Sequence, residues 1–305
     1  MAIEEPPVLV IGATGFVGKQ VAAALLEQGA AVRALVRTPA KARSLAADGV
    51  ELIPGDMLDP VAVGQAVDGV SAVVVCVHTI SRQVTDRSQG FMDVEALGLE
   101  NVAAACAASG VKRVMYVTSI GVAEHAGSSW LRGRWATEQA LFSSGLDVTV
   151  LRPGLIVGRG GDGFGIVNRG ATTRFTLAIA ARRQKFRTVA VGDLARDIVD
   201  LIDRPDSAGK ALDVGSDDVL TMREMSAIVA ESLQRRPGRL VFIPAGLIRL
   251  LAPVVERIAK VPRGAISGFV GDGPREDMTG DPTALREILG RADRPFREAI
   301  VGQVG

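Results

Sequence analysis

The first 150 residues alternate short apolar runs with longer stretches in which apolar residues recur at helical spacing. Runs such as Val8–Ile11 and Ala72–Val77 contain almost no polar residue, a pattern typical of parallel strands that are covered on both faces. Strands that alternate with helices predict an α/β fold with a doubly wound parallel sheet. The expected strands are 8–11, 31–36, 51–54, 72–77, 114–118 and 147–151, and the expected helices begin near Phe16 and cover 39–47, 60–67, 94–109 and 130–144.

Beyond residue 150 the pattern is less regular. The segment Gly154–Gly165 is so rich in glycine that it predicts a loop rather than a regular element. This loop is either a flap over a ligand or a plain surface connection. In the first case Phe164, Ile166 and Val167 are expected to contact the substrate.

A small C-terminal subdomain is expected to follow, with short strands at 212–215 and 240–243 and a helix over 222–235. Residues 244–258 predict an amphipathic helix that is broken at Pro253. Its apolar face packs inside the subdomain, covers an apolar substrate or meets a partner. A locally basic run before this region is either a solvated face or a site for an acidic substrate or partner; it consists of Arg169, Arg174, Arg182, Arg183, Lys185 and Arg187.

Three glycines follow the first strand at the spacing G-x-x-G-x-x-G: Gly12, Gly15 and Gly18. A glycine-rich turn from a strand into a helix leaves N–H groups at the positive end of the helix dipole, where a pyrophosphate can bind. Gly12 permits the tight turn, Gly15 lets the backbone approach the phosphates, and Gly18 lets the helix lie close to the sheet. The pattern therefore predicts a Rossmann-type dinucleotide-binding domain.

The residues after the second strand bear on which dinucleotide is bound. NAD-selective sites place an acidic residue about 20 residues beyond the glycines, where it binds the ribose 2′-hydroxyl. This chain has Arg37 there and Lys41 one helical turn later. A guanidinium suits a 2′-phosphate, so we expect NADP(H). The alternative is a solvated basic start of a helix.

The composition limits the partners of this 305-residue chain. Its formal net charge of +1 implies no bulk attraction to nucleic acid or to an anionic membrane. The two cysteines, Cys76 and Cys106, lie in apolar segments and give no disulfide framework. No apolar run reaches the roughly 18 residues of a membrane span, and no cluster of metal ligands is evident. We expect a soluble cytoplasmic protein, a monomer or homodimer, whose partner is a small molecule.

Several stretches resemble a known family: Val-Arg-Ala-Leu-Val-Arg37, Gly-Asp56, Gly-Val-Lys-Arg-Val-Met-Tyr-Val-Thr-Ser119 and Leu-Arg-Pro153-Gly154. With the glycine loop, they resemble the atypical short-chain dehydrogenase/reductases, especially NmrA-like members, over residues 8–215. The resemblance implies that Asp56 binds the adenine, although an Asp here is also typical of a turn or helix cap. The cofactor-binding residues expected in all are Gly12, Thr14, Gly15, Phe16, Val17, Gly18, Arg37, Lys41, Asp56, Met57, Val77, Thr118, Arg134, Pro153, Gly154 and Ile156.

The resemblance also implies a division of the chain. Residues 1–155 are expected to form the NADP(H)-binding domain. A strand at 188–191 and a helix from Gly192 resemble the family's segment that returns to the main sheet, so 186–215 is assigned to this domain too. Residues 156–185 and 216–305 are then the smaller substrate-binding or lid region.

The family's catalytic motif is altered in this chain. The resemblance implies that Ser119 hydrogen-bonds the substrate carbonyl, but Trp130 and Arg134 stand where the family has the Tyr and Lys of Tyr-x-x-x-Lys. Arg134 can still contact the nicotinamide ribose. The single tyrosine, Tyr116, falls inside a strand and cannot be the acid.

Loss of the acid does not by itself exclude catalysis. General acid catalysis raises the reaction rate about 10²–10⁴-fold. Holding hydride donor and acceptor in a near-attack geometry gives effective molarities of about 10⁵–10⁸ M, which is a larger contribution. The proton would then come from Ser119, from water, from a substrate hydroxyl or from one of the two histidines. His78 and His125 both follow strands on the crevice side, where each is either a proton carrier or an ordinary loop residue.

Three functions fit these observations. The first is an NADPH-dependent ketoreductase for a bulky apolar ketone, such as an aromatic polyketide of the angucyclinone type in antibiotic biosynthesis. The second is a non-catalytic NADP(H)-binding sensor or regulator of the NmrA type, which the missing Tyr and Lys favour. The third is an accessory subunit of a respiratory complex, supported only by the helix around 247–258. Because Ser119 and Pro153 are retained, we expect the reductase.

Overall fold

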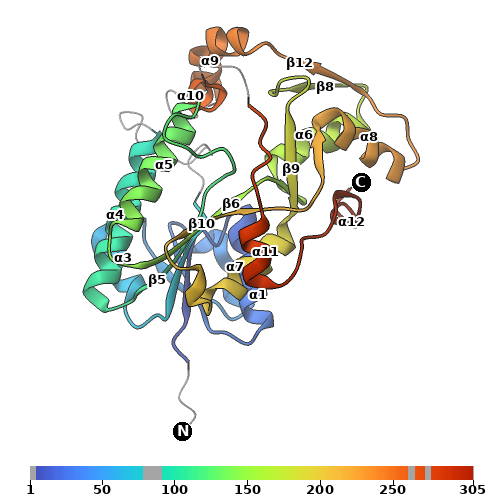
Figure 1. Cartoon of the computed structure of the whole chain (residues 1–305). Helices are drawn as coiled ribbons and strands as arrows, with labels where there is room; N and C mark the ends of the chain where they lie inside the picture. The colour runs from blue at the N-terminus through green and yellow to red at the C-terminus, as the bar shows by residue number, and fades with distance from the viewer. Residues whose placement is uncertain (1–4, 78–90, 260–264, 272–275, 305) are drawn as a thin grey trace.

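The computed structural model describes residues 5–77, 91–259, 265–271 and 276–304. Its centre is a seven-stranded sheet in the order β10-β6-β5-β4-β1-β2-β3, in which every pair of neighbours is parallel (Figure 1). The expectation of a doubly wound, Rossmann-type α/β fold is confirmed. The strands are β1 (Val8–Ile11), β2 (Val32–Val36), β3 (Glu51–Pro54), β4 (Ala72–Val75), β5 (Arg113–Val117), β6 (Asp147–Pro153) and β10 (Lys210–Val214).

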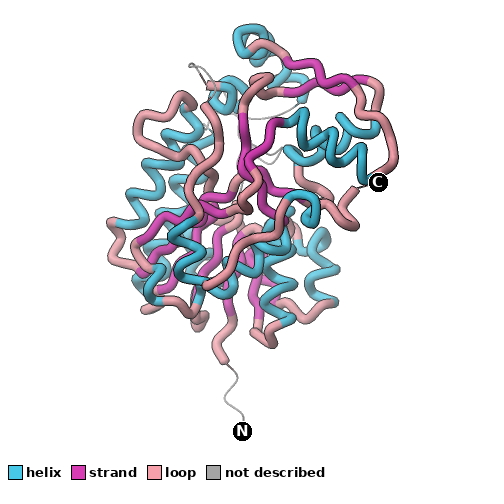
Figure 2. The backbone as a smooth tube through the Cα atoms, turned by 45° about the vertical axis from the view of Figure 1, so that its right-hand side comes forward, coloured by secondary structure: helices cyan, strands magenta, loops and turns pink. Residues whose placement is uncertain are grey.

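Helices cover both faces of this sheet (Figures 1 and 2). On one face α1 packs against α7, and on the other α3, α4 and α5 lie side by side. The helices of the sheet layers are α1 (Phe16–Glu27), α3 (Pro60–Val67), α4 (Phe91–Ser109), α5 (Ser129–Phe142) and α7 (Val191–Ile202), with the short η1 (Pro39–Ala42) and α2 (Arg43–Ala47) after β2.

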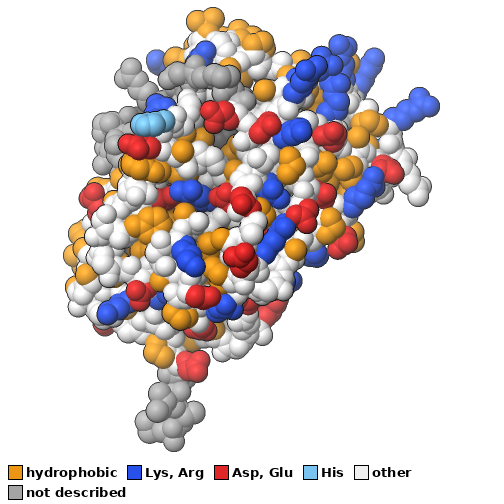
Figure 3. All heavy atoms as spheres, viewed as in Figure 1, with side chains coloured by type: hydrophobic (Ala, Val, Ile, Leu, Met, Phe, Trp, Pro, Cys, Tyr) orange, Lys and Arg blue, Asp and Glu red, His pale blue; other side chains and the backbone are white. Residues whose placement is uncertain are grey.

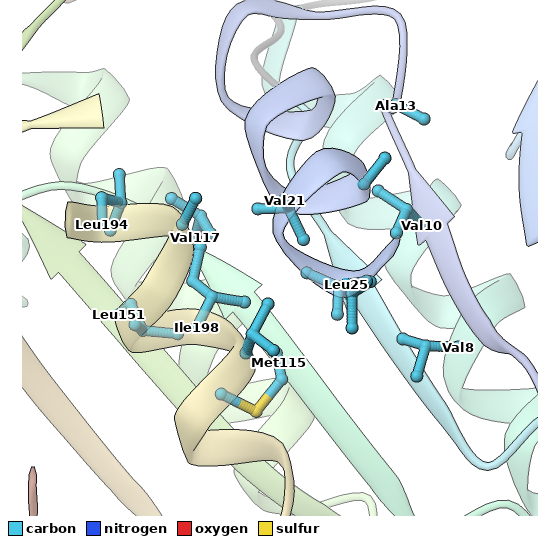
Figure 4. Packing of buried hydrophobic residues seen from close by; sticks show 14 of the residues in the cluster. Val8, Val10, Ala13, Val21, Leu25, Met115, Val117, Leu151, Leu194 and Ile198 are labelled. Atoms are coloured by element: carbon cyan, nitrogen blue, oxygen red, sulfur yellow. The ribbon is translucent and has the colours of Figure 1, made fainter. Parts of the chain in front are cut away.

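The near-continuous apolar strands are buried as the sequence predicts. All four residues of β1 and of β4 are buried, because helices cover both faces. Figure 4 shows one of the two resulting layers, in which Val10 of β1 and Met115 of β5 meet Val21 and Leu25 of α1 and Ile198 of α7. The packing of this layer holds α1 against the sheet, with its first turn at the carboxyl edge.

A second region stands beside the carboxyl edge. It contains a three-stranded sheet in the order β11-β9-β7 and a parallel pair of β8 and β12. Its strands are β7 (Leu155–Val157), β8 (Phe175–Ala178), β9 (Lys185–Ala190), β11 (Val219–Thr221) and β12 (Arg239–Phe242), and its helices are α6 (Asp162–Thr172), α8 (Met222–Ser232), α9 (Ala245–Ala259), α10 (Ala265–Val270) and α12 (Phe296–Ala299). The short η2 (Pro205–Ser207) precedes β10, and α11 (Thr283–Leu289) packs against α7 and β10.

Two strands belong to the opposite sheet from the one predicted. The strand at 212–215, expected in the C-terminal subdomain although 186–215 was also assigned to the cofactor domain, is β10, which joins the main sheet beside β6, with Leu212 opposite Leu151. The strand expected at 188–191 is β9, which lies in the small sheet between β7 and β11. The sequence of a short strand does not show which strands it pairs with, because pairing depends on contacts with residues that are distant in sequence. The division of the chain into domains at residue 155 stays a prediction.

Two local predictions are also wrong. The glycine-rich stretch after Gly154 holds strand β7 and the first turn of α6, not only a loop. Phe164 and Val167 of α6 are buried in the core of the second region, and Ile166 packs against that core, so these residues do not form a substrate-facing flap. Burial of this face outweighs the low helix propensity of glycine. Helix α9 continues across Pro253, which lies on its exposed side, where water can bond the carbonyl that proline leaves unpaired.

Within the described residues, no helix has the length and apolar character that crossing a membrane requires.

Candidate cofactor and substrate site

The turn between β1 and α1 accepts only glycine at its first position. Gly12 has a φ of +93°, a conformation that residues with a Cβ rarely adopt. A Cβ on Gly12 would lie 2.8 Å from the carbonyl oxygen of Cys76, at the end of β4. The turn is therefore pressed against the neighbouring strand, and the predicted role of Gly12 as the tight-turn glycine matches its geometry.

The other two glycines bring the start of α1 against this turn. A Cβ on Gly18 would lie 2.2 Å from the Gly12 carbonyl oxygen, and one on Gly15 would lie 3.1 Å from it. The Gly15 N–H donates to the Gly12 carbonyl at 2.9 Å. Close packing at these positions is therefore possible only without side chains.

The first turn of α1 has the properties of an anion site. No side chain caps it, and it contains no acidic residue. Helix α3 differs, since the Asp59 side chain accepts the Val61 N–H at its N-terminus. Uncapped N–H groups at a helix start attract a phosphate through hydrogen bonds and the helix dipole. The observed turn therefore fits the predicted pyrophosphate.

The ring of Phe16 holds a second glycine-rich loop over this turn. A Cβ on Gly161 would lie 2.9 Å from the Phe16 ring, and one on Gly158 would lie 3.0 Å from it. The loop from β7 to α6 therefore crosses the first residue of α1. These glycines are explained by close packing on Phe16, a reason that the sequence did not reveal.

The residues expected to bind the adenosine end lie at the carboxyl ends of β2 and β3. Arg37 and Lys41 are exposed, Arg37 directly after β2 and Lys41 within η1. One carboxylate oxygen of Asp56 accepts the Leu58 N–H at 3.1 Å, which is the turn-forming role of an Asp after a strand. This contact agrees with the turn alternative; binding of adenine by Asp56 stays a prediction.

Ser119 lies where β5 and β6 end side by side. Its hydroxyl is half-buried and donates to the Ile120 carbonyl at 3.1 Å, and the Ile120 N–H donates to the Pro153 carbonyl at 3.0 Å. Gly154 follows, where a Cβ would lie 2.2 Å from the Arg187 carbonyl. The structure therefore brings Ser119 together with the 153–156 segment, which is expected to hold the nicotinamide.

Trp130 and Arg134 form a buried stack on α5. The Arg134 guanidinium lies 4.7 Å from the Trp130 ring centre and is 1% exposed. Its Nε lies 3.2 Å from a carboxylate oxygen of Glu95 on α4. Its two Nη atoms donate at 3.4 Å to the carbonyls of Val117 and Val77, at the ends of β5 and β4. Arg134 therefore ties two strand ends together; its contact with a ribose stays a prediction.

Tyr116 belongs to the same buried cluster. Its hydroxyl donates to Glu95, and burial together with this carboxylate holds the pKa of Tyr116 well above its ordinary value. A fully buried phenol that keeps its proton cannot protonate a substrate at the strand ends. The expectation that Tyr116 is not the acid agrees with this position.

A second buried carboxylate, Glu138, lies on α5, one helical turn after Arg134. Glu138 accepts a hydrogen bond from Thr118 at 2.7 Å and is held by Arg152, whose Nε donates to both carboxylate oxygens at 3.2 Å. Glu95, Glu138 and Arg152 were not among the predicted site residues. The spacing of Arg134 and Glu138, four residues apart on one helix, would instead have predicted a pair within α5, whereas Arg134 pairs with Glu95 and Glu138 with Arg152.

The remaining titratable candidates are less closely tied to this site. The His125 side chain is 90% exposed and lies 4.0 Å from the Glu124 carboxylate, as a surface residue does. His78 lies outside the described residues. Burial raises the pKa of the Cys76 thiol to about 12, so it stays protonated. Cys76 packs against the main core as a partly buried residue.

Comparison with known proteins identifies the family. The model of the NAD(P)H-binding family matches residues 12–205, which is more than half of the chain and includes the glycine turn, Ser119 and the 153–156 segment. The chain belongs to the NAD(P)H-binding family.

Two relatives that are similar to this NAD(P)H-binding protein over nearly their whole length are named as reductases. An NAD(P)H azoreductase of Xenophilus azovorans is 28% identical, with 95% of this chain and 96% of the relative covered. A (4-alkanoyl-5-oxo-2,5-dihydrofuran-3-yl)methyl phosphate reductase of Streptomyces griseus is 27% identical, with 95% of each covered. The predicted NmrA-like resemblance is confirmed, and the family is one of NAD(P)H-dependent oxidoreductases.

Solved structures of this fold include one with a cofactor. The structure of a Citrobacter sp. triphenylmethane reductase complexed with NADP(H) matches with a TM-score of 0.72 at 21% identity, covering 97% of this chain and 100% of the other. At this identity the match bears on the fold alone. NAD(P)H as the cofactor is confirmed by the family; the choice of NADP(H) over NAD(H) stays a prediction.

Proposed function

We propose that this NAD(P)H-binding protein is an NADPH-dependent carbonyl reductase that acts on a bulky apolar ketone without a tyrosine acid. Aromatic polyketide ketones are the first substrate class to test, together with quinones and with the azo compounds that the azoreductase relative suggests. The bound nicotinamide would supply a hydride. The chain's own residues must then bind the acceptor, orient its carbonyl and hydrogen-bond its oxygen.

The observation that carries this proposal is the position of Ser119. Its half-buried hydroxyl lies at the joint ends of β5 and β6, where the next residue, Ile120, is hydrogen-bonded to Pro153. An oriented hydroxyl can stabilise the charge that develops on a carbonyl oxygen during hydride addition. The Tyr position cannot supply this bond, since Trp130 is 4% exposed and offers no acidic group.

Replacing Ser119 by alanine is expected to lower kcat by about 10²–10³-fold, the effect of removing one donor to an oxyanion. NADPH affinity should stay unchanged, because in this proposal the hydroxyl bonds the substrate and not the cofactor. Rates are measured as consumption of NADPH with a panel of aromatic ketones and quinones. Ser119→Thr is the matched control, and it should retain most of the activity because it keeps the hydroxyl. A wild-type rate in Ser119→Ala would remove this role, and comparison with His78→Ala and His125→Ala would then test the histidines.

Replacing Arg37 by aspartate is expected to weaken NADPH binding by roughly 10–100-fold, with little loss for NADH, since a bond to a charged 2′-phosphate is replaced by repulsion. Dissociation constants for both cofactors are measured by titration. Arg43→Asp is the control, because Arg43 is also exposed and lies at the start of the neighbouring α2. Equal weakening of both cofactors by Arg37→Asp would contradict the 2′-phosphate assignment.

A non-catalytic NADP(H) sensor is the second candidate. It is favoured by the buried ion pair of Arg134 with Glu95, which gives the residue at the Lys position a structural partner. Tight NADPH binding without turnover of any acceptor in the panel would favour the sensor. Turnover that requires Ser119 would exclude it.

A further inference from the structure

Helix α9 exposes the apolar side that a helix normally buries. Its inward stripe is Ile248, Ala252 and Glu256, and the Glu256 carboxylate accepts the Ile266 N–H at 2.9 Å. A surface helix usually places its apolar residues inward and its charges outward. Here Arg257 is exposed, but most outward residues are aliphatic and 44–77% exposed; they are Leu247, Leu250, Leu251, Val254, Val255 and Ile258.

The neighbouring strand pair adds to this surface. Strands β8 and β12 pair in register, with Phe175 opposite Arg239 and Leu177 opposite Val241. The outward side chains Phe175, Leu177 and Val241 are 57%, 63% and 40% exposed. Only two residues separate β12 from α9, and Figures 1 and 2 both place β8, β12 and α9 at the end of the molecule opposite the N-terminus. We call this surface, from α9 through β8 and β12, the α9–β12 face.

Arginines gather at the border of the α9–β12 face. Arg174, Arg235, Arg236 and Arg239 line an open hollow of about 580 Å³ beside Phe175. Figure 3 shows Lys and Arg side chains massed at this end of the molecule, next to the apolar side chains at its top. The carboxylate of Glu231, at the end of α8, is paired with Arg297 at 2.8 Å.

The charge distribution along the chain separates this face from the rest. Residues 163–192 and 232–255 contain ten Lys or Arg and no Asp or Glu, whereas the rest of the chain contains 25 Lys or Arg and 34 Asp or Glu. Strands β8 and β12 come from these two acid-free segments and bring them together. The net charge of +1 therefore hides two basic segments without acidic residues, whose paired strands bring Arg174 and Arg239 to this face.

Basic residues beside exposed aliphatic and aromatic side chains match an anionic lipid surface. Arginines pair with lipid phosphates while the apolar side chains enter the acyl boundary. A second copy of this chain fits less well, because a two-fold contact would place the two basic borders against each other. We propose that the α9–β12 face docks this protein on anionic membrane surfaces.

Vesicle co-sedimentation of the full chain tests this proposal, and it does not depend on any reductase activity. Vesicles of phosphatidylcholine with phosphatidylglycerol should carry the protein down, and pure phosphatidylcholine vesicles should carry far less. High salt should reduce the bound fraction, because it screens the contacts of the arginines with the phosphates. Equal sedimentation with both vesicle types, or none with either, would overturn the proposal.

Variants separate the two parts of the face. The partition coefficient onto anionic vesicles should fall about a hundredfold in the triple variant Arg174→Gln, Arg236→Gln and Arg239→Gln. Each basic residue near an anionic surface raises this coefficient about fivefold. Arg43→Gln, Lys112→Gln and Lys210→Gln together remove the same charge from exposed positions of the dinucleotide domain, and should have a much smaller effect. Partitioning that falls equally in both triple variants would contradict a localised face.

The apolar part is tested by Leu250→Glu with Ile258→Glu, which should abolish sedimentation. Val61→Glu is the control, because Val61 is 67% exposed on α3, distant in sequence from the face. Gel filtration accompanies each assay. If the wild-type chain is a dimer that Leu250→Glu with Ile258→Glu dissociates, the face joins two copies and lipid docking is wrong.

Discussion

Replacing Gly18 by alanine is expected to weaken NADPH binding by about a hundredfold, equivalent to about 2.7 kcal/mol of binding free energy. The added Cβ would lie 2.2 Å from the Gly12 carbonyl oxygen, so the start of α1 must move away from the turn. The N–H groups of that first turn then no longer converge on a pyrophosphate. Overpacking should also lower the free energy of unfolding by about 1–3 kcal/mol. Titration with NADPH and urea unfolding measure the two effects.

Gly64→Ala is the matched control for this change. Gly64 lies in α3, and a Cβ there would meet no atom within 4 Å. Alanine should therefore raise the free energy of unfolding by about 0.5–1 kcal/mol, the ordinary gain over glycine in a helix. Its NADPH affinity should equal that of the wild type. If Gly18→Ala also binds NADPH normally, the turn does not hold the pyrophosphate.

Replacing Glu95 by glutamine is expected to lower the free energy of unfolding by about 3–5 kcal/mol, because it leaves the Arg134 guanidinium charged and buried without its carboxylate. Both side chains are 1% exposed, and the ion pair is 3.2 Å long. Glutamine can still accept the hydrogen bond from Tyr116, so the loss should come from the charge. Chemical unfolding of the variant and the wild type measures it.

The double variant Glu95→Gln with Arg134→Met tests the same explanation. Removing both charges should recover most of the stability that either single change loses, since well-packed neutral side chains often replace a buried pair without loss. Arg204→Met with Asp206→Asn removes an exposed pair and should barely move the unfolding midpoint. If the two single losses at Glu95 and Arg134 simply add, the pair is not coupled and the explanation fails.

Much of the dinucleotide domain was predictable because its signals are local. Apolar runs indicate which strands are covered on both faces. Gly12, Gly15 and Gly18 indicate where the backbone must turn and lie close to another backbone segment. Strand β9 and strand β10 exchanged sheets relative to the prediction, since neither sequence encodes its partner. Helix α6 formed in a glycine-rich segment because Phe164 and Val167 are buried in the core.

The candidate site also combines features that the sequence shows with features that only the structure shows. The position of Ser119 after a strand and the substitution of Tyr and Lys by Trp130 and Arg134 are visible in the sequence. The partner of Arg134 is not, because Glu95 lies 39 positions earlier and reaches it only when α4 packs against α5. Glu138, Thr118 and Arg152 meet for the same reason, through the packing of α5 beside β5 and β6.

By itself, the sequence predicted the succession of strands and helices in the dinucleotide-binding domain and the glycine turn, and its family resemblance implied the loss of the usual acid. These depend on backbone conformations and residue types at fixed short spacings. Only the tertiary structure decided which charges neutralise each other beneath the site, and that α9 turns its apolar side outward beside two acid-free segments. An amphipathic pattern gives a helix two faces, but which face is buried depends on the surface that the rest of the chain offers it.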